Sequence, residues 1–224
     1  MNIRKNQRNK MLIGYYKLSV LLTYIGVASG VLGIFFAINH MTTYALICLM
    51  FAGVCDGFDG KVARACKREK EEKEFGIQID SLADTVSFVV LPTIILYGFG
   101  LTEFYHIILY ILYILAGIIR LGYFNVKAME SKEEKMSYYT GLPVTSSAII
   151  FPVIYILKYF MPIPKFQVIY TMVMVFTALL FVLNFKLKKP KSVWSYIFFI
   201  GAIIMAIILY LFALKRGIRI WKYI

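Results

Sequence analysis

The chain has 224 residues, 60% of them hydrophobic, and a mean hydropathy of +0.73. This composition excludes an ordinary soluble domain and indicates a protein embedded in a membrane. The formal net charge of +13 is divided among segments that flank apolar stretches. That distribution argues against nucleic-acid binding and suits contact with anionic lipid headgroups.

Residues 1–17 carry five basic side chains among apolar ones, which is typical of an arm at the cytosolic surface of a membrane. The apolar run that follows has about 21 residues, which is longer than the core of a signal peptide. It also lacks a convincing small-residue cleavage site. We therefore predict a retained membrane span rather than a leader.

Seven apolar segments, each near the roughly 20 residues that a bilayer requires, predict an all-α, polytopic helix bundle. They lie at residues 18–38, 42–64, 77–99, 104–125, 143–160, 166–185 and 192–214. The fifth segment is short and lies between Pro143 and Pro162, so a count of six or eight stays open.

Lysine and arginine residues mark one side of this bundle. They gather at residues 4–17, 61–73, 127–135 and 186–191, which fall on one side if the N-terminus is cytoplasmic. The positive-inside rule then predicts a multi-pass protein of the cytoplasmic membrane with these ends in the cytosol. The basic tail at 215–224 would lie outside after seven crossings. Either the last segment does not cross, or the rule is broken there.

All four aspartates of the chain lie in one stretch. Asp56 and Asp59 share a helix face, and so do Asp80 and Asp84, because residues three or four apart project to the same side. Residues 66–74 between the pairs are highly charged and are expected to be solvated. Antiparallel helices pair at a constant sum of residue numbers. Asp56 is therefore expected level with Asp84, and Asp59 with Asp80.

Four ionised carboxylates at one depth repel one another, and each costs roughly 2.5–3.5 kcal/mol near hydrocarbon. Such a cluster persists if cations neutralise it or if some groups stay protonated. Because oxygen ligands select hard ions, the stretch predicts one or two divalent cations, Mg²⁺, Mn²⁺ or Ca²⁺, at the cytosolic boundary. Other metal ligands are not indicated, since the spacing of Cys48, Cys55 and Cys66 forms no motif and His40 and His106 lie at predicted outer helix ends.

Two spaced motifs resemble the signature of the CDP-alcohol phosphatidyltransferases. They are Asp-x-x-Asp-Gly-x-x-Ala-Arg over residues 56–64 and Gly-x-x-x-Asp-x-x-x-Asp over residues 76–84. The chain matches every fixed position. The resemblance implies a six-helix transferase core, here residues 18–187, in a homodimer. The segment at 192–214 would then be an additional helix, followed by the basic tail.

The resemblance also implies roles for the residues of the signature. Mg²⁺ or Mn²⁺, with two ions bound, would be held by the four carboxylates: Asp56, Asp59, Asp80 and Asp84. Asp84 would in addition be the general base. The CDP moiety of the lipid substrate would be held by a second set: Asp56, Gly60, Ala63 and Arg64.

Further residues narrow the resemblance to the phosphatidylserine synthase branch, whose members transfer the phosphatidyl group of CDP-diacylglycerol to L-serine and release CMP. They are Ser81-Leu82-Ala83, Arg120-Leu121, Phe124-Asn125 and Gly141-Leu142-Pro143. Arg120 and Asn125 then become candidates for binding the serine carboxylate. Tyr123 and Thr145 depart from this branch, in which many members have arginine and proline at these positions.

Two alternatives stay open. The same chemistry could use glycerol 3-phosphate or an inositol phosphate as acceptor. Arg120 is the inward basic residue of the fourth and fifth segments, and a single charge favours an unphosphorylated alcohol. Buried aspartates also occur in cation transporters, but there they lie near the middle of the bilayer. Here they lie at one boundary, beside Gly60 and Arg64.

Overall fold

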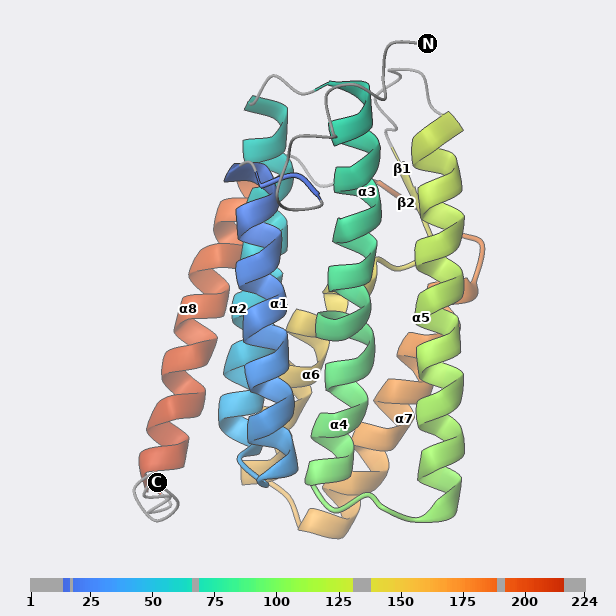
Figure 1. Ribbon diagram of the computed structural model, residues 1–224. Coiled ribbons are helices and arrows are strands. Elements are labelled where there is room, and N and C mark those ends of the chain that lie inside the picture. Colours follow the sequence, from blue (N-terminus) through green and yellow to red (C-terminus); the bar gives the residue numbers. More distant parts are fainter. Residues whose placement is uncertain (1–13, 17, 66–68, 131–137, 189–191, 216–224) are drawn as a thin grey trace.

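The computed structural model describes residues 14–16, 18–65, 69–130, 138–188 and 192–215. Its long helices run up and down beside one another (Figure 1). In chain order the elements are α1 (Leu18–Ile38), α2 (Thr42–Ala65), α3 (Lys70–Asp84), η2 (Thr85–Val90), α4 (Leu91–Gly98), α5 (Phe104–Glu130), β1 (Tyr138–Thr140), η3 (Val144–Ser146), α6 (Ser147–Tyr155), η4 (Ile156–Tyr159), α7 (Ile163–Val182), β2 (Lys186–Lys188) and α8 (Ser192–Lys215).

Each predicted apolar segment coincides with helical structure over most of its length. Among the described residues, four helices are long and apolar enough to cross a membrane: Val20–Ile38, Lys70–Gly98, Phe104–Met129 and Ile163–Val182. Shorter apolar helices cover Val144–Tyr159 and Ile200–Phe212. The predicted fold class, a polytopic helical membrane protein, is thus confirmed. The count of seven crossings and the division into core, additional helix and tail stay predictions.

The third long helix begins earlier than the hydrophobic pattern predicts. Residues from Lys70 onward are already helical, although their side chains are charged and mostly exposed. The reason is a capping box, in which the backbone N–H of Glu69 donates to Oε2 of Glu72 at 3.1 Å. Glu71 also places negative charge at the positive end of the helix dipole. The charged stretch is therefore solvated, as expected, but much of it belongs to the helix.

A π-helical turn, η2, follows Asp84 directly and joins α3 to α4 in one continuous helix. Pro92 has no backbone N–H, so it cannot donate to the carbonyl of Phe88 four residues before it. The hydroxyl of Tyr113 in α5 donates to that carbonyl at 3.2 Å. This hydrogen bond lies in the apolar interior, because Tyr113 and Phe88 are both buried.

Glycines let α1 pack closely against its neighbours, as the small residues of the first segment suggest. A Cβ atom at Gly30 would lie 2.6 Å from Oγ of Ser87 in η2, and one at Gly26 would lie 3.4 Å from Cβ of Cys55 in α2. Small residues allow such close helix approach in membranes. These close contacts therefore fix the position of α1 along its own axis relative to α2 and η2.

Gly30→Ala is expected to lower the stability of the protein. The added methyl group has no room against Ser87, and overpacking typically costs about 1–3 kcal/mol, which exceeds the gain in helix propensity of roughly 1 kcal/mol. The midpoint of thermal unfolding in detergent measures this. Gly201→Ala in α8 is the matched control, because its added methyl group meets nothing within 4 Å. An unchanged midpoint for Gly30→Ala would contradict the close packing.

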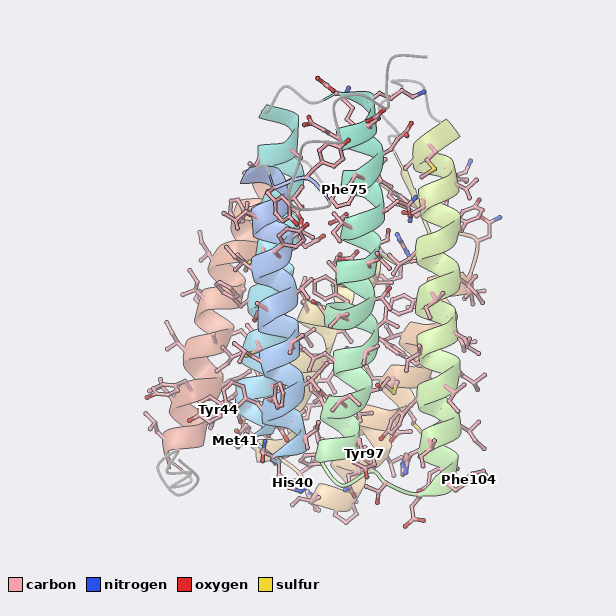
Figure 2. All side chains as sticks on the ribbon, in the orientation of Figure 1. His40, Met41, Tyr44, Phe75, Tyr97 and Phe104 are labelled. Carbon is pink, nitrogen blue, oxygen red and sulfur yellow. The ribbon has the colours of Figure 1, made fainter. Side chains whose placement is uncertain are left out.

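The two ends of the bundle differ in character. At one end lie the first turns of α3, which carry Phe75, and the antiparallel ribbon of β1 and β2, in which Tyr139 pairs with Leu187 (Figures 1 and 2). We call this the aspartate end. His40 lies at the opposite end, and its Nδ1 is 2.7 Å from the carbonyl of Gly98 (Figure 2). His40 therefore lies far from the aspartates, as predicted, while the side of the membrane on which it lies stays a prediction.

The described part of the N-terminal arm consists of residues 14–16, and it contacts α3 at the aspartate end. The hydroxyl of Tyr15 donates to Oε2 of Glu71 at 3.1 Å, and its ring lies 5.3 Å from that of Phe75. At the other terminus, α8 runs toward the end of the bundle opposite the aspartates (Figure 1). The remaining basic residues of the predicted tail, 216–224, lie outside the described residues.

Candidate metal and substrate site

Three of the four aspartates converge on one point. Asp56 of α2 and Asp80 and Asp84 of α3 each offer a carboxylate oxygen, and these oxygens lie within 4.8 Å of one another. The level pairing of Asp56 with Asp84 predicted from the helix register is thus confirmed. Asp84 is buried, whereas Asp56 and Asp80 are partly exposed. The group is therefore accessible to solvent at Asp56 and Asp80, whereas Asp84 is buried.

Asp59 lies beside this group and has a partner of its own. Its Oδ2 accepts a hydrogen bond of 3.0 Å from Oγ1 of Thr23, which comes from α1. Its carboxyl also interacts with that of Asp80. Asp59 is 7% exposed. The fourth carboxylate is thus close to the cluster, but it is oriented by a different helix.

All four aspartates line one small cavity. The rest of its wall comes from α1, α2, α3 and η2. It includes apolar residues such as Val27 and Phe88 and the hydroxyl residues Thr23 and Ser87. Most of these wall residues are apolar or lack a side chain, so charges in the cavity are poorly screened by solvent. Carboxylates in such surroundings need positive charge nearby.

The donor set fits a hard divalent cation. Ligand oxygens around Mg²⁺ lie at about 2.0–2.1 Å from the ion, so oxygens on opposite sides of it are roughly 4 Å apart. The three converging oxygens, within 4.8 Å of one another, therefore need only a small closure to share one ion. Carboxylate oxygens suit Mg²⁺, Mn²⁺ or Ca²⁺, and no thiol or imidazole joins this group among the described residues.

The residues predicted to hold the CDP moiety continue the same face of α2. Gly60 and Ala63 follow Asp56 and Asp59 toward the end of the helix, and both are partly exposed. At Gly57 an added Cβ atom would meet nothing within 4 Å, so there is open space beside this turn. The side chain of Arg64 lies outside the described residues.

Arg120 of α5 lies across from the cluster and is 7% exposed. Its Nε donates to the carbonyl of Leu142 at 2.7 Å, and its charge interacts with that of Asp84. Leu142 is itself fixed, because its N–H donates to the carbonyl of Leu180 at the end of α7. Gly141 before it has φ +71°, a conformation that favours glycine. The tight turn of Gly-Leu-Pro thus orients the guanidinium plane.

Asn125 lies one and a half turns after Arg120 on the same helix and contacts α3. Its Oδ1 accepts a hydrogen bond of 2.7 Å from Oγ of Ser81, the residue after Asp80. With its oxygen engaged in this way, the amide nitrogen of Asn125 remains as a donor. Both residues predicted to bind the acceptor therefore lie on α5, next to α3.

The two residues that depart from the phosphatidylserine synthase branch, Tyr123 and Thr145, lie in different elements. The side chain of Tyr123 is 48% exposed on α5, where Nζ of Lys127 lies 4.6 Å from its ring centre. Thr145 belongs to the short helix η3 that precedes α6. Tyr123 is thus on an outward surface, so the change at this position does not alter the lining of the cavity.

Sequence reasoning did not identify three groups that orient the site: the hydroxyls of Thr23 and Ser81 and the carbonyl of Leu142. Ser81 and Leu142 lie within the motifs that carry the resemblance, which was the available signal. Thr23 lies within an apolar helix, and nothing in the pattern distinguishes it from other threonines.

Comparison with known proteins agrees with this geometry. Residues 16–224 match the family model of the CDP-alcohol phosphatidyltransferases. The chain is 31% identical over 153 residues to an archaetidylserine synthase of Methanothermobacter thermautotrophicus, an alignment that covers 68% of this chain and 63% of the relative. It is 28% identical over 189 residues to a CDP-diacylglycerol–serine O-phosphatidyltransferase of Helicobacter pylori, covering 82% and 77%.

A third relative, the CDP-diacylglycerol–serine O-phosphatidyltransferase of Saccharomyces cerevisiae, is 34% identical over 112 residues, or 47% of this chain and 40% of the relative. The chain therefore spans less than two thirds of the length of some relatives. The family match, in contrast, extends over nearly the whole chain and includes the four carboxylates and α5. The protein belongs to the CDP-alcohol phosphatidyltransferase family.

Proposed function

We propose that the protein transfers the phosphatidyl group of CDP-diacylglycerol to the hydroxyl of L-serine, giving phosphatidylserine and CMP. The observation that carries this proposal is the convergence of Asp56, Asp80 and Asp84 at one end of the bundle, with Arg120 across from them. The relatives named above support it, because their names all include serine as the acceptor or as part of the product.

In the proposed reaction, the oxygen of the serine hydroxyl forms a bond to the phosphorus that carries the diacylglycerol. The bond between that phosphorus and the oxygen of CMP breaks, and CMP leaves. The hydroxyl proton passes to the carboxylate of Asp84, which acts as general base. Asp84 is the deepest of the converging carboxylates, and Arg120 lies near it, so an acceptor held by Arg120 would be close to the base.

We propose that the carboxylates hold one or two divalent ions, Mg²⁺ or Mn²⁺. Asp56, Asp80 and Asp84 would be ligands of one ion, and Asp59 would join through its contact with Asp80. Bound ions would offset the charge of the diphosphate and stabilise the leaving phosphate. The open space beside Gly57, with Gly60, Ala63 and Arg64 further along α2, would accommodate the CDP moiety.

The acceptor would be recognised through its carboxylate. The guanidinium of Arg120 is oriented by its Nε bond to Leu142, and the amide of Asn125 is oriented by Ser81. A guanidinium with parallel N–H donors and an amide N–H donor can together bind the carboxylate of a small acid. The proposal includes a homodimer in the cytoplasmic membrane with the aspartate end in the cytosol. The lysines of that end, such as Lys61, Lys70 and Lys127, support this orientation.

The acceptor is tested by CMP release from the purified protein with Mn²⁺ or Mg²⁺. L-Serine, glycerol 3-phosphate and an inositol phosphate are compared, each with CDP-diacylglycerol and with an ether-linked CDP lipid. We expect serine to be preferred by at least about 100-fold, because sites with directed hydrogen bonds discriminate strongly. Faster release with a phosphorylated alcohol would reject serine but keep the chemistry. Absence of CMP release with every alcohol tested, despite bound metal, would reject the transferase proposal and favour cation transport.

A further inference from the structure

Thr23 makes an unusual use of its hydroxyl for a threonine in an apolar helix. Threonine in helices commonly donates to a carbonyl of its own chain three or four residues before it. Thr85, Thr93 and Thr177 do so here, at 2.7 to 2.8 Å. Thr23 instead donates across to Asp59 of α2 at 3.0 Å. Its hydroxyl therefore serves another helix.

The position of this donor is rigid. Gly26, one turn after Thr23, approaches Cys55 of α2, and Gly30 approaches Ser87 of η2, so α1 can neither slide nor withdraw without opening close backbone contacts. Thr23 and Asp59 are both 7% exposed, so water does not compete strongly for the hydrogen bond. A fixed donor on a packed helix can hold a carboxylate in one orientation.

Asp59 is held differently from the other three carboxylates. Asp59 is absent from the group of three whose oxygens converge within 4.8 Å, although it lies next to Asp80. Because Oδ2 accepts from Thr23, this hydrogen bond orients the whole carboxylate of Asp59, including Oδ1. Groups that orient a metal ligand from behind typically change metal affinity by about 10- to 100-fold when removed.

We propose that Thr23 is a positioning residue of the metal site: its hydroxyl holds the Asp59 carboxylate so that this carboxylate can bind a divalent cation beside Asp80. The inference rests on the proposed function, since it assumes that the carboxylates hold cations. It assigns Thr23 no contact with substrate. Its effect passes through Asp59 alone, and this distinguishes it from a general packing role.

The test measures Mn²⁺ binding to the purified full-length protein in detergent, without substrate, by the loss of the free Mn²⁺ signal in electron paramagnetic resonance. Thr23→Val keeps the shape and removes the hydroxyl, and is expected to weaken at least one Mn²⁺ site by about 10- to 100-fold. Thr23→Ser should retain wild-type binding. Thr177→Val is the matched control, because Thr177 is buried and bonds within its own helix; it should leave Mn²⁺ binding unchanged.

A double-mutant cycle with Asp59→Asn separates positioning from structure. In the Asp59→Asn background, Thr23→Val should cause no further loss of Mn²⁺ affinity, whereas damage to packing would add to it. Wild-type Mn²⁺ affinity in Thr23→Val would overturn the positioning role, and so would additive losses of Mn²⁺ affinity in the cycle. In either case, serine-dependent CMP release by the wild-type protein would leave the proposed function intact. A wild-type protein that binds no Mn²⁺ and releases no CMP would overturn both the positioning role and the proposed function.

Discussion

Asp84→Asn is expected to reduce CMP release by at least about 10²–10⁴-fold, the usual contribution of a general base. Asparagine has nearly the shape of aspartate, but its amide cannot accept the hydroxyl proton. It also removes the negative charge of one of the three converging ligands, so Mn²⁺ binding should weaken as well. Initial rates of CMP release at saturating serine and CDP-diacylglycerol measure the first effect.

The control for this variant is Glu103→Gln, which changes an acidic side chain just before α5, at the end of the bundle away from the aspartates. It should leave the rate unchanged. The thermal unfolding midpoint of Asp84→Asn should remain near or above that of the wild type, because removing one of several crowded carboxylates relieves repulsion. Turnover within about tenfold of the wild type would show that another group accepts the proton.

Arg120→Lys is expected to raise KM for serine by roughly 10- to 100-fold, since a hydrogen bond to a charged group contributes about 1.5–3 kcal/mol. Arginine can donate its Nε–H to Leu142 and at the same time present its two terminal nitrogens to the acceptor. Lysine keeps the charge but has a single nitrogen and cannot do both. The KM for CDP-diacylglycerol should change much less. Steady-state kinetics with each substrate varied in turn separates the two constants.

Lys127→Met is the matched control for Arg120→Lys, because Lys127 lies on the same helix and its ammonium packs over the ring of the outward-facing Tyr123. Both KM values should stay as in the wild type. If Arg120→Lys left KM for serine unchanged and lowered only the stability, the arginine would be a link between α5 and the turn at Leu142 and would not recognise the acceptor.

The convergence of the carboxylates could be predicted from the sequence because it depends only on helix periodicity and on antiparallel pairing. Asp56 and Asp84 are brought level by these two rules, and the structure places their oxygens in one group with Asp80. The close approach of α1 also follows from residue type, since a glycine without a side chain allows a neighbouring helix to come close wherever that helix lies.

The orienting contacts could not be predicted in the same way, because each depends on a partner distant in sequence. Thr23 and Asp59 are 36 residues apart, Ser81 and Asn125 are 44 apart, and nothing local favours either pair. A threonine hydroxyl in a helix can equally bond to its own backbone, as Thr177 does. Only the packed arrangement of helices decides between these outcomes.

Two features of the fold were missed for local reasons. The charge of Lys70–Glu74 suggested a connection, but the capping box at Glu69 is compatible with a solvated helix end, and the helix starts there. The ribbon of β1 and β2 has three residues in each strand, and its strands are separated by α6 and α7. Such short strands give no alternating pattern that could be recognised.

The π-helical turn after Asp84 makes the chain length in this region part of the site. In a regular α-helix each residue turns the chain by about 100°. The backbone hydrogen bonds of the π turn reach back five residues instead of four, so η2 accommodates one more residue than an α-helix would over the same rotation. Converting residues 85–90 to regular α-helix with no residue removed would therefore turn Asp80 and Asp84 by about that angle relative to α4, whose Leu91 and Ile95 are buried in the core. The extra residue of η2 therefore directs two carboxylates toward Asp56, although none of the residues 85–90 is among the three that converge.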